Sequence, residues 1–222
     1  MVTWLLLRTG ARSAAENMAV DDVLLHSVAK WRQPVLRFYS WSERAASFGY
    51  FQKYKDVEKT TVLRPLVRRP TGGGLVPHDA DWTYSVSFSP GTEWYGLKAV
   101  ESYERVHAWI RDAFAKIGVG AELAEAQASM PGGQCFAGAE QFDVMLNNHK
   151  IAGAAQRRTK HGLLIQGSIQ PPAGIKRADW ETAFLDVGSL SCEPLALSAE
   201  FEEQIQNLAA RKYAQPSYNE RR

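Results

Sequence analysis

The sequence predicts an α+β fold with a mixed, largely antiparallel sheet flanked by helices. Short runs rich in aromatic and β-branched residues, separated by turn residues, predict strands. Two longer segments, about 14–31 and 97–117, repeat apolar residues every three or four positions and predict helices. Several of the later strand runs follow each other closely, which favours antiparallel pairing. We expect a single domain over residues 1–222, because the chain has no long linker and no internal repeat.

The first elements are an early helix and three short strands. Ser13 followed by Glu16 fits a capping box, so the helix is expected to begin at about Ala14 and to reach Trp31. Its apolar face comprises Met18, Leu24, Leu25, Val28 and Trp31. Strands are predicted over 35–41, 46–51 and 61–67, the last interrupted by Pro65.

A glycine-rich segment over residues 68–79 follows these strands. Gly72, Gly73 and Gly74 leave bare backbone on which a ligand can lie, and Arg68 and Arg69 place positive charge beside them. The spacing fits neither a P-loop nor a dinucleotide fingerprint. The segment therefore predicts a cationic loop that holds the phosphate or carbonyl of an acyl carrier. The alternative is a tight turn with two solvated arginines.

The next strand, 82–88, alternates between two faces. The face expected toward the core carries Trp82, Tyr84, Val86 and Phe88. The other face is expected to form a polar wall of Thr83, Ser85 and Ser87. The helix over 97–117 presents Val100, Tyr103, Val106, Ile110, Phe114 and Ile117 to the sheet and stops at Gly118.

The second half of the chain predicts consecutive antiparallel strands followed by helices. The strands are 142–146, 150–155 and 162–169, and a turn at Asn147, Asn148 and His149 joins the first two. Helices are expected over 179–186 and 199–214. Residues from about 173 to 222 then form a helical C-terminal extension of the same domain.

Composition narrows the class of protein. With 45% hydrophobic and 23% charged residues the chain is an ordinary globular protein, and a net charge of +2 does not indicate nucleic-acid binding. Basic residues gather between Lys150 and Lys160 and could meet an acidic partner. No run is long enough to cross a bilayer and no basic leader is evident, so we expect a cytoplasmic protein with reduced thiols at Cys135 and Cys192.

Individual candidates each have a structural alternative. Cys135 follows Pro131, Gly132, Gly133 and Gln134, which indicates a loop, although a cysteine is commonly a small buried hydrophobe. Lys150 follows a turn, where a surface lysine is usual. His78 and His161 are expected to line a site rather than transfer protons. No metal site is expected, because no cysteine or histidine pair has ligand spacing. Cys192 receives no role.

Three motifs, in their order, resemble the lipoate and octanoate protein ligase/transferase family. They are the glycine loop, Gly132-Gly-Gln-Cys-Phe136, and 148–156 with its continuation to Leu163. Supporting segments are 17–21, 36–41, 47–52 and 166–169. The resemblance implies an acyltransferase domain of the class II aminoacyl-tRNA synthetase/biotin ligase type, with the glycine loop lining an acyl tunnel. It implies that Lys150 touches the acyl carbonyl and that the substrate-binding residues are Arg68, Arg69, Thr71, Gly72, Gly73, Gly74, His78, Gly153 and Ala154.

Within that family Cys135 is the main discriminator. Cys135-Phe136 before Gln141-Phe-Asp143 resembles the cysteine-dependent octanoyltransferases, in which this loop cysteine is the nucleophile. The ligases typically show Asn-Asp where this chain has Phe142-Asp143 and carry an accessory domain, whereas only about fifty residues follow Ile169. The glycine triplet, however, is at least as typical of ligases.

The implied activity is transfer of octanoate from acyl carrier protein to a lysine of a lipoyl domain of a 2-oxoacid dehydrogenase or of a glycine cleavage H protein. A Cys135 acyl-enzyme exchanges one thioester for another without ATP, so no cofactor is expected beyond the donor's phosphopantetheine. A cation, with Lys150 the best candidate, would lower the pKa of the thiol, and amides near Gly153 and Ala154 would stabilise the oxyanion. The alternatives are an ATP- and Mg-dependent lipoate ligase core, a lipoyl-protein amidotransferase, and a non-catalytic acyl- or adenylate-binding module.

Overall fold

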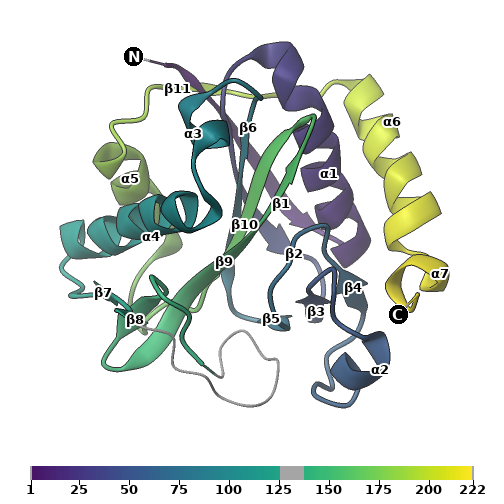
Figure 1. Ribbon diagram of the computed structural model, residues 1–222, viewed down its shortest axis with the longest axis horizontal. Coiled ribbons are helices and arrows are strands. Elements are labelled where there is room, and N and C mark those ends of the chain that lie inside the picture. Colours follow the sequence, from purple (N-terminus) through teal and green to yellow (C-terminus); the bar gives the residue numbers. More distant parts are fainter. Residues whose placement is uncertain (1, 126–137, 222) are drawn as a thin grey trace.

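Eight strands form the main sheet in a computed structural model that describes residues 2–125 and 138–221 (Figure 1). Their order is β11-β1-β2-β6-β10-β9-β8-β7. The strands are β1 (Trp4–Arg12), β2 (Val35–Trp41), β6 (Trp82–Phe88), β7 (Glu122–Leu123), β8 (Val144–Leu146), β9 (His149–Thr159), β10 (Gly162–Ile169) and β11 (Cys192–Pro194). β1 pairs in parallel with β2 and β11, and the other pairings are antiparallel. The predicted fold class is confirmed.

A second, three-stranded sheet carries the glycine loop. It comprises β3 (Ala45–Phe48), β4 (Leu66–Arg68) and β5 (Val76–His78), in the order β4-β3-β5. The strand predicted over 46–51 ends early at Phe48, and the one predicted over 61–67 is wrong except for its last two residues. Pro65 lacks the N–H that a sheet ladder needs, so pairing begins only after it. The short helix α2 (Tyr54–Val57) precedes this point.

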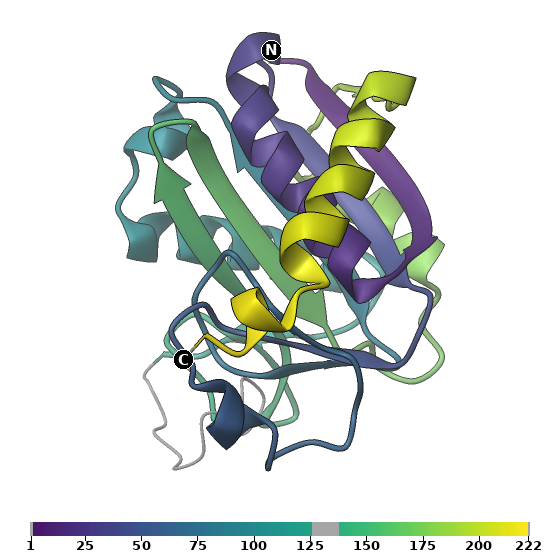
Figure 2. The same cartoon turned by 90° about the vertical axis from the view of Figure 1, so that its right-hand side faces the viewer.

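Helices cover both faces of the main sheet. On one face lie α1 (Ala14–Trp31), α6 (Ala199–Leu208), a π-helical turn over Ala209–Tyr213 and α7 (Pro216–Asn219). On the other lie α3 (Glu93–Gly96), α4 (Ala99–Lys116) and α5 (Arg177–Val187). Figure 2 shows α6 running alongside α1. Since α1 is enclosed between the sheet and α6, it is buried on more than its predicted apolar stripe.

The alternation predicted for β6 is confirmed on its core side. Tyr84, Val86 and Phe88 pack in the cluster beneath α4 and α5, together with Phe114 and Trp180. The opposite, polar face of β6 is also buried, because α1 lies over it. The strand therefore separates an apolar layer from a polar one.

The predicted apolar face of α4 is buried except at the N-terminal end of the helix. Val106, Ile110 and Phe114 are fully buried, whereas Val100 is 57% exposed. Val100 lies in the first turn of the helix, where it lines the open groove. The helical period was therefore correct, and the groove beside the first turn leaves Val100 exposed.

The N-terminal strand β1 was not predicted. A strand buried on both faces has a near-continuous apolar run rather than alternation, and residues 4–7 form such a run. The helices α5 and α6 were predicted correctly to within two residues, apart from the π-helical turn after Leu208, whereas α7 was not predicted. Among the described helices, none has the length and apolar character required to span a membrane.

Candidate active site

A narrow cavity lies where the two sheets meet. Its walls come from α1, β2, β3, the glycine loop, β5, β9 and β10, and include Met18, Trp41, Arg69, His78, Gly153 and Ala154. Its free volume of about 30 Å³ holds about one water molecule. A wider groove of about 620 Å³ lies beside it, lined by Gly72, Gly73, Ala154 and residues of α4.

Arg69 braces the glycine loop from inside the cavity. Its Nη2 donates to the carbonyl oxygens of Gly72 and Gly74, each at 2.8 Å, and its Nη1 donates to Ser47 Oγ at 3.0 Å. The side chain is 6% exposed. Arg69 is thus near the predicted ligand position and sets the shape of the loop.

Arg68 faces a different region. Its guanidinium is fully buried and donates to the carbonyl oxygens of Tyr50, Gln52 and Asn219 at 2.8, 2.7 and 2.8 Å. It lines neither the cavity nor the adjoining groove. The alternative of two solvated arginines is therefore wrong, and Arg68 ties the strand before the loop to α7.

The glycine loop requires bare backbone at two places. A Cβ on Gly49 would lie 1.9 Å from the carbonyl oxygen of Gly73, so β3 can approach the loop only because residue 49 is glycine. Gly73 itself has a φ of 82°, in the left-handed region that glycine tolerates best. Gly72 and Gly73 both face the groove.

His78 belongs to a buried hydrogen-bonded chain. Its Nδ1 lies 2.8 Å from Asp81 Oδ2 and its Nε2 lies 2.7 Å from Ser47 Oγ, while the ring stacks on Trp41 at 3.7 Å. Since a carboxylate only accepts, the ring donates from Nδ1 to Asp81. Arg69 donates to the same serine hydroxyl that contacts Nε2. His78 lines the cavity.

Lys150 is buried rather than on the surface. Its Nζ lies 2.6 Å from Asp143 Oδ2, and the two side chains are 4% and 0% exposed. The backbone N–H of Glu140 donates to Asp143 Oδ2 at 2.6 Å, and the Tyr103 hydroxyl donates to Asp143 Oδ1. The ammonium is therefore held at a defined point beside the groove.

The hairpin turn directs Lys150 into this position. Asn147 and Asn148 have φ angles of 49° and 63°, the signature of a tight turn that matches strand twist. Lys150 pairs with Met145 across the hairpin, and the register shifts between Met145 and Val144, just before the segment that carries Asp143.

Gly153 and Ala154 begin an edge of the main sheet. Among the described residues, β8 pairs with β9 only as far as Ala152, so alternate backbone N–H groups beyond it point away from β10. A Cβ on Gly153 would lie 2.7 Å from Lys150 Cε and 2.9 Å from Nζ. The glycine therefore leaves the space that the ammonium occupies.

His107 stands behind this pair on α4. Burial lowers the pKa of His107 to about 3, the hydrogen bond from its Nδ1 to the Phe142 carbonyl oxygen acts in the opposite direction, and the charge of Lys150 lowers it further. The ring contacts Tyr103 at 4.0 Å between centroids. A neutral His107 thus supports the Tyr103–Asp143 contact.

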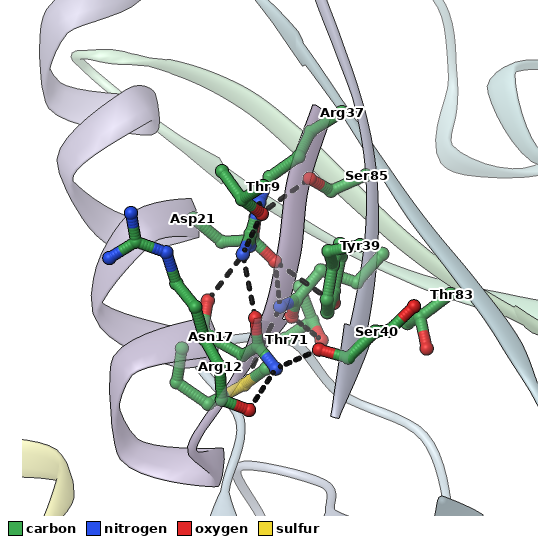
Figure 3. A network of polar contacts seen from close by, with 12 residues as sticks. Thr9, Arg12, Asn17, Asp21, Arg37, Tyr39, Ser40, Thr71, Thr83 and Ser85 are labelled. Carbon is green, nitrogen blue, oxygen red and sulfur yellow. Dashed lines mark hydrogen bonds and ion pairs between the residues drawn. The ribbon is translucent and has the colours of Figure 1, made fainter. Parts of the chain in front are cut away.

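Thr71 connects the glycine loop to a buried polar network (Figure 3). Its hydroxyl donates to Gln166 Oε1 at 2.7 Å, and Gln166 Nε2 donates to Asp21 Oδ2 at 2.7 Å. Asp21 Oδ1 accepts from Arg37 Nη1 and from the Ser85 hydroxyl, both at 2.7 Å. The network joins α1, three strands of the sheet and the loop.

The predicted nucleophile cannot be compared with the site. Cys135 lies outside the described residues, as do Gly132 and Gly133. The groove is lined on either side of this segment by Glu125 and Glu140. Cys192 is a free thiol in β11 whose pKa is raised by burial, with Arg8 acting in the opposite direction.

His161 does not line the site. It lies in the turn between β9 and β10, with its ring 4.5 Å from that of His26, and is absent from both cavity walls. The residues around His161 do not indicate toward which part of the molecule its side chain lies. The length of β9 sets the position of the turn and therefore of His161.

Sequence reasoning missed the partners of the predicted residues. Asp81 and Ser47 hold His78, Asp143 and Tyr103 hold Lys150, and Gln166 holds Thr71. The hairpin register around Asn147 could have brought Asp143 next to Lys150. The other contacts join segments distant in sequence, for which no local pattern exists.

Comparison with known proteins identifies relatives of this chain. The family model for the lipoyl protein ligase A/B catalytic domain matches residues 13–170. An octanoyltransferase LipM of Exiguobacterium sp. is 32% identical over 95% of this chain and 95% of its own. That of Bacillus subtilis is 34% identical over 75% of this chain and 65% of its own.

Solved structures show the same fold. A lipoate-protein ligase A bound with ATP has a TM-score of 0.78 at 21% identity, covering 99% of this chain and 98% of that one. A bi-partite lipoate protein ligase from Thermoplasma acidophilum also has a TM-score of 0.78, at 18% identity, covering 99% of this chain and 97% of that one. With the family model matching most of the chain, the protein belongs to the lipoyl protein ligase A/B catalytic domain family.

Proposed function

We propose that the chain is an octanoyl-carrier-protein:protein N-octanoyltransferase that works through an acyl-enzyme on Cys135. The observation that carries the proposal is the 32% identity to an octanoyltransferase over 95% of both chains. A relation of that extent makes the chain an acyltransferase. The donor, the nucleophile and the acceptor are the proposed parts.

The proposed first step transfers the acyl group to the enzyme. The Cys135 thiol loses its proton and the thiolate attacks the thioester carbonyl; the bond from that carbon to the donor sulfur breaks, and the departing donor thiolate takes up the proton that Cys135 released. The ammonium of Lys150 donates a hydrogen bond to the carbonyl oxygen, while an outward N–H near Gly153 or Ala154 stabilises the developing oxyanion. Because Asp143 balances its charge, Lys150 acts as an oriented donor rather than as a lone cation.

The proposed second step delivers the acyl group to an acceptor lysine of a lipoyl domain or H-type protein. The neutral amine attacks the acyl-enzyme, the carbon–sulfur bond to Cys135 breaks, and the amine proton restores the thiol. The transfer requires no ATP, because the thioester of the acyl-enzyme is converted into an amide.

The cavity between the sheets is the proposed acyl pocket. Its free volume of about 30 Å³ is too small for an eight-carbon chain, so its walls must move when the chain enters. Met18 is suited to this, because its unbranched thioether side chain adapts its shape at low cost. Arg69 and His78 line the pocket, Thr71 and the three glycines shape the loop that borders it, and Arg68 holds that loop from behind.

Intact mass spectrometry after incubation with octanoyl carrier protein tests the proposal. We expect one octanoyl mass that hydroxylamine removes, and we expect Cys135→Ala to abolish it. Cys192→Ala is the matched control and should acylate normally. Full acylation of Cys135→Ala would refute the nucleophile.

Parallel incubations separate the alternatives. Modification of a lipoyl domain by free lipoate plus ATP, with no transfer from the carrier protein, would establish a ligase instead. Transfer from an octanoylated lipoyl protein alone would establish an amidotransferase. Binding of the donor without turnover would establish a non-catalytic module.

A further inference from the structure

A cluster of cations and aromatic rings lies beside the glycine loop. The guanidinium carbons of Arg157 and Arg221 lie 5.5 and 4.4 Å from the ring centroid of Tyr50. Arg221 also lies 4.6 Å from the ring centroid of Tyr218. We call Tyr50, Arg157, Tyr218 and Arg221 the arginine–tyrosine surface.

The charge of this surface is not balanced by ion pairs. In the part of the chain that the structure describes, the recorded ion pairs include neither Arg157 nor Arg221. The nearby Asp22 is engaged by Lys212 at 2.6 Å. Glu220 precedes Arg221 in the chain and is the adjoining acidic residue. The surface therefore has a net positive charge and suits an anionic partner.

The surface is connected to the proposed site along β9. Residues 153, 155 and 157 share one face of the strand by its two-residue period. Arg157 donates to the carbonyl oxygen of Pro70 at 3.4 Å, which brings it to the start of the glycine loop. Gly153 lies against the Lys150 ammonium, and the four residues from there to Arg157 span about 13 Å of extended strand.

We propose that the arginine–tyrosine surface docks an acidic acyl carrier protein, with Arg157 and Arg221 binding the phosphodiester that links its pantetheine arm. This inference rests on the proposed function. A guanidinium group binds phosphate through two parallel N–H···O hydrogen bonds. Stacking on a tyrosine ring holds the guanidinium plane in a fixed orientation. Phe51, 72% exposed and packed against Tyr50 at 5.1 Å between centroids, adds an apolar contact at the rim.

The distance to Lys150 favours the donor over the acceptor. An acceptor lysine reaches the acyl carbonyl with a short side chain, so its protein must lie directly over the site. A donor that carries its thioester on a long flexible arm can dock about 13 Å away and still deliver the carbonyl. Ala155, which lies between Gly153 and Arg157 on this face of β9, lines the groove together with Gly72 and Gly73.

Donor kinetics and binding test this assignment. Arg157→Gln and Arg221→Gln should each raise the KM for octanoyl carrier protein about fivefold with kcat unchanged, and should weaken its dependence on salt. The KM for the acceptor lipoyl domain should not change. Arg158→Gln is the matched control, because this neighbouring arginine lies over Tyr95 at 5.3 Å, on the opposite face of β9. It should behave as wild type.

Donors of decreasing size identify what the arginines bind. With octanoyl-phosphopantetheine the two variants should retain part of the KM defect, and with the octanoyl thioester of N-acetylcysteamine, which lacks phosphate, they should match wild type. An unchanged carrier-protein KM in both variants, an equal defect in Arg158→Gln, or a raised KM for the acceptor instead would overturn the proposal.

A binding measurement keeps the inference independent of turnover. Calorimetric titration with holo carrier protein should give a Kd about fivefold higher for each arginine variant than for wild type or Arg158→Gln. A wild-type protein that binds the carrier through this surface but transfers no octanoate would refute the proposed function alone. Equal Kd values across all four proteins would refute the surface alone.

Discussion

Lys150 shows how a single residue acquires its position from its neighbours. Asp143 fixes the ammonium, Tyr103 and the Glu140 amide fix Asp143, and Gly153 leaves the volume in which the ammonium lies. Each contact limits one direction of movement. A buried pair of this kind requires both charges, because removing one leaves the other desolvated and unpaired.

Gly153→Ala tests the space that Lys150 needs. The added Cβ would lie 2.7 Å from Lys150 Cε, so the end of the Lys150 side chain must shift from its position. We expect kcat to fall about tenfold or more, since misplacing a catalytic group by about 1 Å costs that much or more. Gly10→Ala in β1 is the control, because nothing lies within 4 Å of its added Cβ. Unchanged transfer by Gly153→Ala, measured as steady-state rate, would contradict this account of Lys150.

The pKa of His107 predicts how stability depends on pH. Burial lowers that pKa to about 3 in the folded chain, whereas an unfolded histidine titrates near 6.5. Between these values the unfolded chain binds more protons, so the free energy of unfolding falls as the pH is lowered from about 6.5 toward 3. Urea unfolding of His107→Asn should show a weaker dependence over this window.

The control for that experiment is His149→Gln. His149 is exposed in the first position of β9, so its removal should leave the pH dependence as in wild type. An unchanged slope in His107→Asn would show that other groups cause the loss of stability in acid.

At the scale of elements, the glycine loop is held from both ends by parts distant in sequence. β3 approaches its tip through Gly49, and α7 holds its first strand through Asn219. The Asn219 Oδ1 accepts from the backbone N–H of Arg68 at 2.8 Å, and its Nδ2 donates to the Tyr213 carbonyl oxygen at 2.8 Å. The last short helix therefore belongs to the structure of the loop.

Asn219→Ala should destabilise the protein through this contact. A buried backbone N–H and carbonyl lose their partners, which costs about 1–3 kcal/mol each before relaxation. We expect the free energy of unfolding to fall by about 2 kcal/mol and the donor KM to rise, because the loop loses its support. Asn207→Ala on the exposed side of α6 should change neither quantity. Wild-type stability in Asn219→Ala, determined by chemical denaturation, would show that α7 is not needed.

At the scale of the whole molecule, the C-terminal segment completes both faces of the sheet. α5 places Trp180 and Phe184 in the cluster under α4, while Ile205 and Tyr213 complete the cluster around α1. The Tyr213 hydroxyl donates to Asp22 Oδ2 at 2.9 Å. These contacts favour the predicted single domain, with residues from about 173 onward as part of it.

Removal of residues 198–222 tests that single domain. The full chain should unfold in one transition with the same midpoint by circular dichroism and by tryptophan fluorescence. The shortened chain exposes the outer side of α1 and should lose cooperative unfolding altogether. A shortened chain that melts cooperatively would show that the extension is a separate unit.

Apart from the polar face of β6, which the alternation predicts and which contributes Ser85, the polar layer inside the molecule has no counterpart in a local pattern. Asp21 on α1, Arg37 on β2 and Gln166 on β10 were not recognised as partners, because each one looks like an ordinary surface residue along its own segment. Their contact depends on α1 lying across the sheet. The same applies to Ser47 and His78, which the second sheet brings together.

The sequence by itself determined the α+β class, the bounds of α1, β2, β6 and β10, the tight turn at Asn147 and the family, because each rests on local periodicity, capping or motif order. The tertiary structure decided that Arg68 supports the loop while Arg69 faces the cavity, that Lys150 is paired with Asp143, and that Arg157 and Arg221 meet at Tyr50. These outcomes depend on which distant segments are packed together, and burial and hydrogen-bond satisfaction act between segments rather than along them.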